Sequence, residues 1–378
     1  MRRQEIELLN RPYDDDSGDV GDRFARALSI DLPNVRALAA DLFADLDPKV
    51  FGIGWWTSYP KLGDKRRILI GDYLNGSIES IEMNLTEAKL HLFELLDWWE
   101  RENTLMADAI ARDPMTGSLK ISHPRQTSPA VRLPGAMCTL HTAGFFRALN
   151  SALDCLGAVL TGVAALPLAI VKCDLTKART NLASKLHDRG DPRAALARRF
   201  QELADKAGPA GWLDWVTQFR HMLLHRARRL QAGELVPRSP ALFGPDGQLV
   251  PRANAVPFLA SEPAWSDVDV VRAAVKSDLL HEHASGTTHG ALASTVFLVD
   301  AFCGALREFW MARKAQPTLI EQPLSQWPST DVPPSVGFLG YCSRSFGEGH
   351  VAASPSYVHR LRCAALSADD VHLWQTFT

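Results

Sequence analysis

The amino-acid sequence predicts a mainly α-helical protein: a bundle of four or more long helices, with a small N-terminal α/β segment and a loop-rich C-terminal tail. The first observation behind this prediction is that apolar residues recur every three or four positions over several long stretches. These stretches are residues 77–113, 136–165 and 290–314. The second observation is that proline, glycine and serine gather between the stretches and again beyond Pro317.

This pattern divides the chain into three segments. We expect an accessory α/β segment at residues 1–76, the helical bundle at 77–316 and the loop-rich extension at 317–378. Hydrophobic residues make up 46% of the 378 positions, which is enough for a packed core. The formal net charge is −2, so any contact with nucleic acid would need a local basic patch. The six cysteines are scattered without paired spacing, as is typical of reduced thiols in a cytoplasmic protein.

The accessory segment has mixed patterning after a polar, acidic stretch of about 25 residues. Residues 34–46 predict a short amphipathic helix with Asn34 as its N-cap. Residues 51–59 and 66–74 are rich in apolar and aromatic side chains and are expected to be strands, joined by a turn near Gly63.

The helical segment is expected to be divided by loops and helix-breaking residues. Residues 114–135 predict a long loop, and Pro167 is expected to end or kink the helix that begins near residue 136. That helix contains the uncharged run 155–171, whose length and proline favour a buried core helix over a membrane span. Asp191 is expected to cap the next helix, with Pro192 at its first position. The further expected elements are a helical segment ending near 186, a stop at 208–211, a loop or hairpin at 233–265, a helix at 268–284 and a strand at 359–366.

The stretch 211–230 predicts a helix with two unlike faces. His221 and His225 are four residues apart and lie nearly opposite the apolar face, with Arg220 on the flank. The apolar face consists of Trp212, Trp215, Val216, Phe219, Met222 and Leu223. A basic tail follows, formed by Arg226, Arg228 and Arg229.

An arginine followed after four residues by a histidine is similar to the motif of the HEPN superfamily of helical nucleotide-binding and RNA-cleaving domains. The match is Arg220 and His225, with the polar residue that follows the arginine in the family at His221 and the basic residue after the histidine at Arg226. The resemblance covers residues 136–232 well, while the other long helices fit only as members of a bundle.

The resemblance implies a metal-independent endoribonuclease without a cofactor, which works as a homodimer on RNA. Arg220 would bind the scissile phosphate, His225 would act as general acid or base, and His221 would help to hold the arrangement. Proteins of this family often serve in toxin–antitoxin or antiviral defence systems, where a neutralising antitoxin or regulatory protein would be the partner. Two motif helices would meet across a two-fold axis, and Leu224, which lies roughly 140° around the helix from Phe219, would lie at or beside it.

The helix expected at residues 136–165 carries a polar stripe along one side. The stripe consists of Arg147, Asn150, Ser151 and Asp154. In the functional interpretation it lines a cleft beside Arg220 and His225, so that Asn150 and Asp154 join the catalytic residues and Arg147 joins the basic tail in binding RNA. The alternatives are a polar network between helices and simple exposure to solvent.

Other functions remain open at this stage. The chain would be a non-catalytic helical module if the same face bound a nucleotide or a protein without cleaving RNA. His221 and His225 have the spacing of a metal pair, but they lack a nearby glutamate and lie in a basic neighbourhood. The cluster of His281, His283 and His289 matches no zinc spacing, and residues 284–288 within it are interpreted as an exposed loop between helices, so no metal site is expected.

Overall fold

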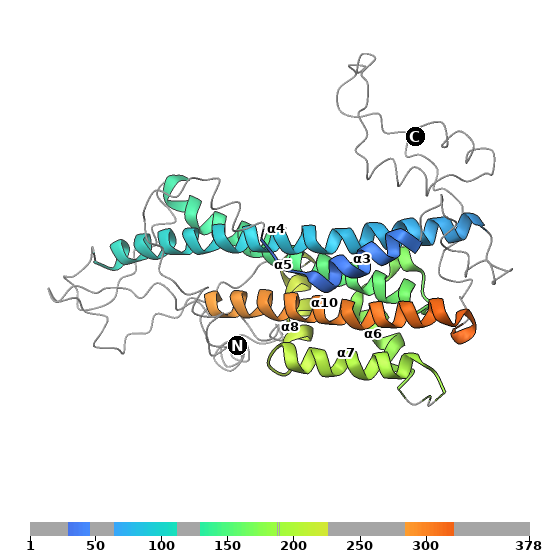
Figure 1. Ribbon diagram of the computed structural model, residues 1–378. Helices are drawn as coiled ribbons and strands as arrows, with labels where there is room; N and C mark the ends of the chain where they lie inside the picture. The colour runs from blue at the N-terminus through green and yellow to red at the C-terminus, as the bar shows by residue number, and fades with distance from the viewer. Residues whose placement is uncertain are drawn as a thin grey trace, which may run out of the picture.

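The computed structural model describes residues 29–45, 64–111, 129–186, 188, 190–225 and 284–320 (Figure 1). Within these ranges the chain forms α-helices and two short 3-10 turns without a strand, so the described part is mainly α. The helices are α3 (Pro33–Asp45), α4 (Asp64–Ala111), α5 (Pro129–Val163), α6 (Leu175–Ala183), α7 (Arg193–Ala207), α8 (Trp212–His225) and α10 (Ala284–Ala315), and the turns are η3 (Ile170–Lys172) and η5 (Pro317–Leu319).

The core is built around α4 and α5, which run side by side and make the most extensive packing of any two described helices (Figure 1). Ile78, Ile81 and Leu85 of α4 and Phe146 and Leu149 of α5 are fully buried in this core. Burying each such side chain stabilises the fold by about 1.5–3 kcal/mol. Helices α6 and α8 pack on α5, α7 packs on α10, and α3 packs between α10 and α4.

The strand predicted at residues 66–74 is wrong, because α4 begins at Asp64 and includes the whole stretch. Ile70 and Leu74 are fully buried and precede Ile78 at four-residue spacing, so they continue the apolar face of the helix. Leu74 also packs against Gly162 of α5. Tertiary packing has overridden the β-propensity of this stretch. The boundary expected after residue 76 therefore falls inside a continuous helix, and the strand expected at 51–59 lies outside the described residues.

The amphipathic helix predicted at residues 34–46 is confirmed as α3, but the predicted N-cap, Asn34, does not cap it. Asn34 is inside the helix, and Oδ1 of Asp300 accepts the backbone N–H groups of Asn34 at 2.9 Å and Val35 at 3.2 Å. The side-chain amide of Asn34 donates to the other oxygen of Asp300 at 2.8 Å. The cap is thus supplied by α10, more than 260 residues away in the chain.

Helix α5 begins at Pro129, so the last residues of the loop predicted at 114–135 are helical. The helix ends at Val163, ahead of Pro167, and Ala165 then adopts the left-handed conformation with φ of 49°. Arg313 of α10 is 1% exposed and donates to the carbonyl groups of Gly162, at 3.2 Å, and Val163. A buried cation therefore satisfies the carbonyl groups that the end of α5 leaves free.

Helices α7 and α8 are separated by residues 208–211, as the sequence predicts. The N-cap of α7 is Pro192, so the prediction of Asp191 as N-cap and Pro192 as first helical residue is wrong by one position, although Oδ1 of Asp191 accepts the backbone N–H of Arg193 at 2.9 Å. Gly211 has φ of +80°, a conformation that glycine adopts without steric cost, and the chain turns there into α8.

The exposed loop predicted for residues 284–288 is wrong, because this stretch forms the first turns of α10. Thr287 and Thr288 are buried, and the hydroxyl of Thr288 donates to the carbonyl of Ala284 at 3.0 Å. Nδ1 of His289 lies 2.7 Å from the carbonyl oxygen of Ser285 in the same helix. The other predicted elements between 226 and 283 and beyond 320 lie outside the described residues.

Two stretches, Arg132–Val163 in α5 and Ala284–Ala315, are long and apolar enough to cross a membrane by length and composition. Their most apolar windows are 72% and 44% buried inside the protein. Core helices of water-soluble proteins meet the same criteria, so these helices do not decide where the protein resides, and a cytoplasmic location stays a prediction.

Candidate functional site

The apolar face of α8 packs against α5, as its spacing predicts. Val216 is fully buried, and Trp212 and Phe219 are nearly so. The ring of Phe219 lies with its centroid 4.6 Å from that of Phe146 and 5.0 Å from that of Trp215. This aromatic cluster fixes the rotation of α8, so Arg220 is directed along the α5 surface. Met222 and Leu223 have side chains outside the described set.

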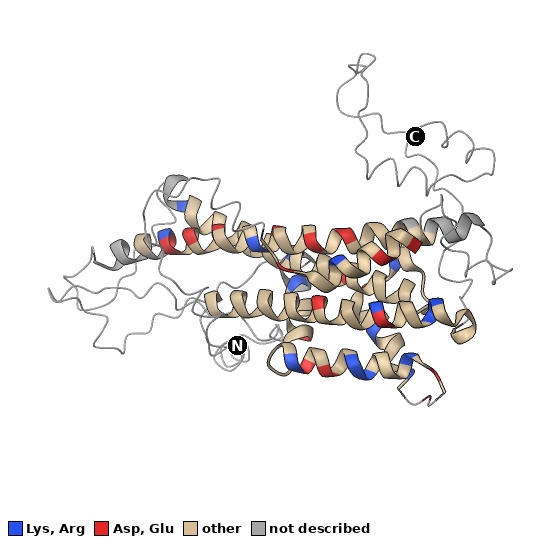
Figure 2. Ribbon diagram, in the orientation of Figure 1, with Lys and Arg blue, Asp and Glu red and all other residues tan. Residues whose placement is uncertain are grey.

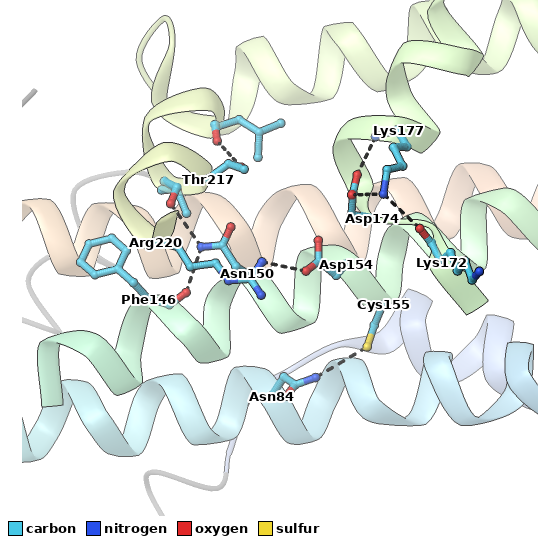
Figure 3. A network of polar contacts seen from close by, with 12 residues as sticks. Asn84, Phe146, Asn150, Asp154, Cys155, Lys172, Asp174, Lys177, Thr217 and Arg220 are labelled. Atoms are coloured by element: carbon cyan, nitrogen blue, oxygen red, sulfur yellow. Dashed lines mark hydrogen bonds and ion pairs between the residues drawn. The ribbon is translucent and has the colours of Figure 1, made fainter. Parts of the chain in front are cut away.

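Arg220 and Asp154 form an ion pair between α8 and α5 (Figure 3). Nη1 of Arg220 donates to Oδ2 of Asp154 at 3.0 Å, and the two side chains are 24% and 34% exposed. Nε of Arg220 is buried without an acceptor within the described part of the chain. The guanidinium is therefore held by one carboxylate, keeps partial access to solvent and retains unused donors.

Asp154 receives contacts from two elements, because the start of α6 lies directly on α5. The backbone N–H of Leu175 lies near its carboxylate and acts to lower the pKa of Asp154. Gly157 makes this approach possible, since a Cβ at that position would lie 2.6 Å from the backbone nitrogen of Leu175. Burial raises the pKa of Asp154 above its usual value, while Arg220 and the Leu175 amide act in the opposite direction and the nearby Asp174 adds to the increase.

Asp174 and Lys177 form a second charged pair beside this site (Figure 3). Oδ1 of Asp174 accepts the backbone N–H of Lys177 at 2.7 Å and caps α6, and Nζ of Lys177 lies 2.9 Å from Oδ2. The pKa of Asp174 is lowered despite the opposing effect of burial, because Lys177 donates to it and Arg220 lies nearby. Sequence reasoning missed Asp174, although an aspartate directly before the helical stretch that starts at Leu175 is a recognisable N-cap.

Asn150 lies buried between α5 and α8 and does not form the wall of an open cleft. It is 2% exposed, and its Nδ2 donates to the carbonyl of Phe146 at 2.9 Å and to that of Val216 at 3.2 Å (Figure 3). Both amide hydrogens are therefore used in joining α5 to α8. Of the predicted polar stripe, Asn150 and Asp154 both contact α8, and Ser151 is partly buried.

Arg147 lies on the side of α5 that faces α4, where it forms an ion pair with Glu87. It is 54% exposed, but its charge is partly balanced by that carboxylate. Acidic and basic residues are interspersed along the described helices (Figure 2). The basic tail of Arg226, Arg228 and Arg229 lies outside the described residues.

His221 and His225 belong to α8 by their backbone, but their side chains and that of Leu224 are outside the described set. The helix is continuous from Trp212 to His225, so Arg220 and His225 are separated by about 7.5 Å along its axis. The same five residues correspond to about 140° around the helix, so the two side chains leave it in different directions.

Two further contacts near the site involve thiols. Nδ2 of Asn84 donates to Sγ of Cys155 at 3.7 Å, and Sγ of Cys173 lies 3.1 Å from the hydroxyl of Thr161. Burial raises the pKa of Cys155 to about 11, so this thiol is protonated near neutral pH. Among the described residues no group of three or more His, Cys, Asp and Glu side chains has the arrangement of a metal site.

Neither a protein-family model, nor a curated protein, nor a solved structure matches this chain. Function is therefore inferred from the residues and their geometry. The arrangement combines a partly exposed guanidinium, a carboxylate that holds it, and a helix that carries two histidines beyond it. Such a set can bind a phosphate and move protons at neutral pH.

Proposed function

We propose that this chain is a metal-independent endoribonuclease of the HEPN type, in which α8 carries the reacting groups and two copies share one cleft. The supporting observation is the position of Arg220, which Asp154 holds at the α5–α8 contact with part of the guanidinium open to solvent. In this proposal the long helices form the bundle of such a domain, the protein is cytoplasmic, and it acts as a toxin or antiviral effector with a neutralising or regulatory partner.

The proposed reaction is attack of an RNA 2′-hydroxyl on the adjacent phosphorus. A base removes the proton of the 2′-hydroxyl, the new P–O bond closes a 2′,3′-cyclic phosphate, and the 5′-oxygen leaves with a proton from an acid. His225 is the proton-transferring group, with His221 beside it on α8. Arg220 stabilises the additional negative charge of the phosphorane through its planar donors.

Asp154 is a positioning residue in this proposal. Its carboxylate orients Arg220, and the amide of Leu175 nearby favours the charged form of that carboxylate. An RNA phosphate would approach the donors of Arg220 that Asp154 leaves unused. Replacing Asp154 with asparagine keeps the shape but removes the charge, so it should weaken the positioning of Arg220 and lower kcat more than it lowers RNA affinity.

The test is cleavage of single-stranded RNA by the purified full chain in excess EDTA, with detection of the cyclic phosphate. We expect cleavage of RNA, none of DNA because it lacks the 2′-hydroxyl, and loss of activity in Arg220→Gln and His225→Ala. Arg179→Gln is the matched control, because Arg179 forms an ion pair with Asp214 that joins α6 to α8 but lies outside the motif. RNA binding without cleavage would favour the non-catalytic module, and activity restored only by zinc would favour a metal hydrolase.

A further inference from the structure

The ends of α4 and α5 project together beyond the other described helices (Figure 1). We call residues 92–111 of α4 and 129–141 of α5 the arm. The main core ends near its base, where Leu92 and Phe145 are the outermost core residues of the two helices. Beyond them, Leu95 and Cys138 are among the few described apolar side chains that are buried. Among the side chains that the structure describes, the arm therefore has fewer buried apolar residues than the rest of the two helices.

His91 of α4 and His141 of α5 face each other at the base of the arm. Their Nδ1 atoms are 3.1 Å apart, and their rings meet edge to face with centroids 5.3 Å apart. Gly144 leaves room for the His91 ring, because a Cβ at position 144 would lie 2.3 Å from the Nε2 atom of His91. The pair is thus a polar contact that joins α4 to α5 near the point where the buried core ends.

The surrounding groups indicate which nitrogen carries each proton. Nε2 of His91 lies 3.6 Å from Oε1 of Glu87, which favours a proton on that nitrogen. Nδ1 of His91 then accepts the hydrogen bond that Nδ1 of His141 donates. Nε2 of His141 is left unprotonated, and it is buried without a partner among the described residues.

The charged groups that act on the pair come from both helices of the arm base. Glu87 and Glu94 belong to α4, and Arg147 belongs to α5. Burial lowers the pKa of His91, and His141 and Arg147 lower it further, while Glu87 opposes them. Burial also lowers the pKa of His141, against the effect of Glu94.

We propose that His91 and His141 form a proton-sensitive latch, which is closed while one imidazole is neutral and releases the arm when both are protonated. With both rings charged, each Nδ1 carries a hydrogen, so the hydrogen bond is lost and two cations face each other at about the same distance. The buried core outside the arm, which includes Leu92 of α4 and Phe145 of α5, does not depend on this hydrogen bond and stays packed. The latch is independent of the proposed ribonuclease activity.

The direction of the pH effect follows from linkage. Both folded-state pKa values lie below that of an unfolded histidine, near 6.5. The latch therefore contributes its full stability above that pH and loses it as the pH falls toward the folded values. The arm is therefore expected to open when the pH falls below neutral.

Hydrogen–deuterium exchange of the full chain, analysed by mass spectrometry, tests the latch at about pH 7.5 and about pH 5, on either side of the ordinary pKa of histidine. Protection factors corrected for intrinsic exchange should fall about tenfold in arm peptides at the lower pH, which is the effect of losing about one hydrogen bond. Peptides of α7 should keep their protection. In His141→Gln the fall should disappear, because glutamine donates to His91 and does not titrate.

His289→Gln is the matched control, since His289 contacts only a carbonyl of its own helix among the contacts described and should leave the arm response unchanged. Equal arm protection at the two pH values in the wild type would overturn the latch, as would a fall that persists in His141→Gln. A fall shared by α7 would mean general acid unfolding and would also count against it. If His141→Gln does not fold, NMR titration of the wild-type imidazoles decides: two coupled transitions below 6.5 support the latch, and two independent ordinary ones refute it.

Discussion

Replacing Gly157 with alanine should destabilise the protein, although alanine is the better helix former. A Cβ at this position of α5 would lie 2.6 Å from the backbone nitrogen of Leu175 and 2.7 Å from its Cα. Backbone atoms cannot rotate away, so the start of α6 must shift, and overpacking of this kind costs about 1–3 kcal/mol. The gain in helix propensity offsets about 0.5–1 kcal/mol of that cost. We expect a net loss of about 1 kcal/mol in the free energy of unfolding, the difference between the middle of each range.

Gly290→Ala is the control for this substitution. Gly290 lies in the interior of α10, and a Cβ there would meet nothing within 4 Å, so only the propensity gain of about 0.5–1 kcal/mol remains. The assay is urea unfolding followed by circular dichroism, with the midpoints compared at equal slope. The two alanines should move the midpoint in opposite directions. A Gly157→Ala protein as stable as the wild type would show that α6 is not packed on α5 as described.

Two further predictions concern the proposed ribonuclease. Replacing Arg226, Arg228 and Arg229 with glutamine should lower RNA affinity and flatten its dependence on salt, because fewer counterions are released on binding; an unchanged salt slope in a filter-binding series would place the RNA elsewhere. Leu224→Arg should place two like charges at the two-fold axis, so that light scattering gives the mass of a monomer and cleavage is lost while the circular dichroism is retained. A wild-type protein that is fully active as a monomer would refute the shared cleft.

Regular spacing along one helix could be predicted from sequence. The buried face of α8, with Val216 and Phe219, follows from the 3.6-residue period, and so does the alignment of Asn150 with Asp154 on α5. The functional interpretation placed Asp154 beside Arg220, and the structure brings these two residues to 3.0 Å. For Asn150 the alternative of a polar network between helices describes the structure better, and sequence alone could not choose between the two because the choice depends on how closely α8 approaches α5.

Contacts between distant parts of the chain could not be predicted in this way. The cap of α3 comes from Asp300, while local pattern favoured Asn34 itself. The contact of Leu175 with Asp154 depends on the missing side chain of Gly157, which local reasoning takes only as a weak helix former. The apolar stretch at residues 66–74 has both β-propensity and helical spacing, and the packing of Leu74 on Gly162 determines which of the two is formed.

The position of α10 in the sequence has a consequence for synthesis on the ribosome. Asp300 caps α3, Arg313 satisfies the end of α5, and the indole of Trp310 donates to Asp45 at 2.8 Å. A nascent chain that has emerged only as far as α8 lacks all three contacts. The backbone groups at the start of α3 and the end of α5 then lack these hydrogen-bond partners, and the apolar side chains that α10 covers face water. The fold is therefore completed late, after most of the chain has been translated. Until then, the growing polypeptide presents apolar surface of the kind that chaperones bind.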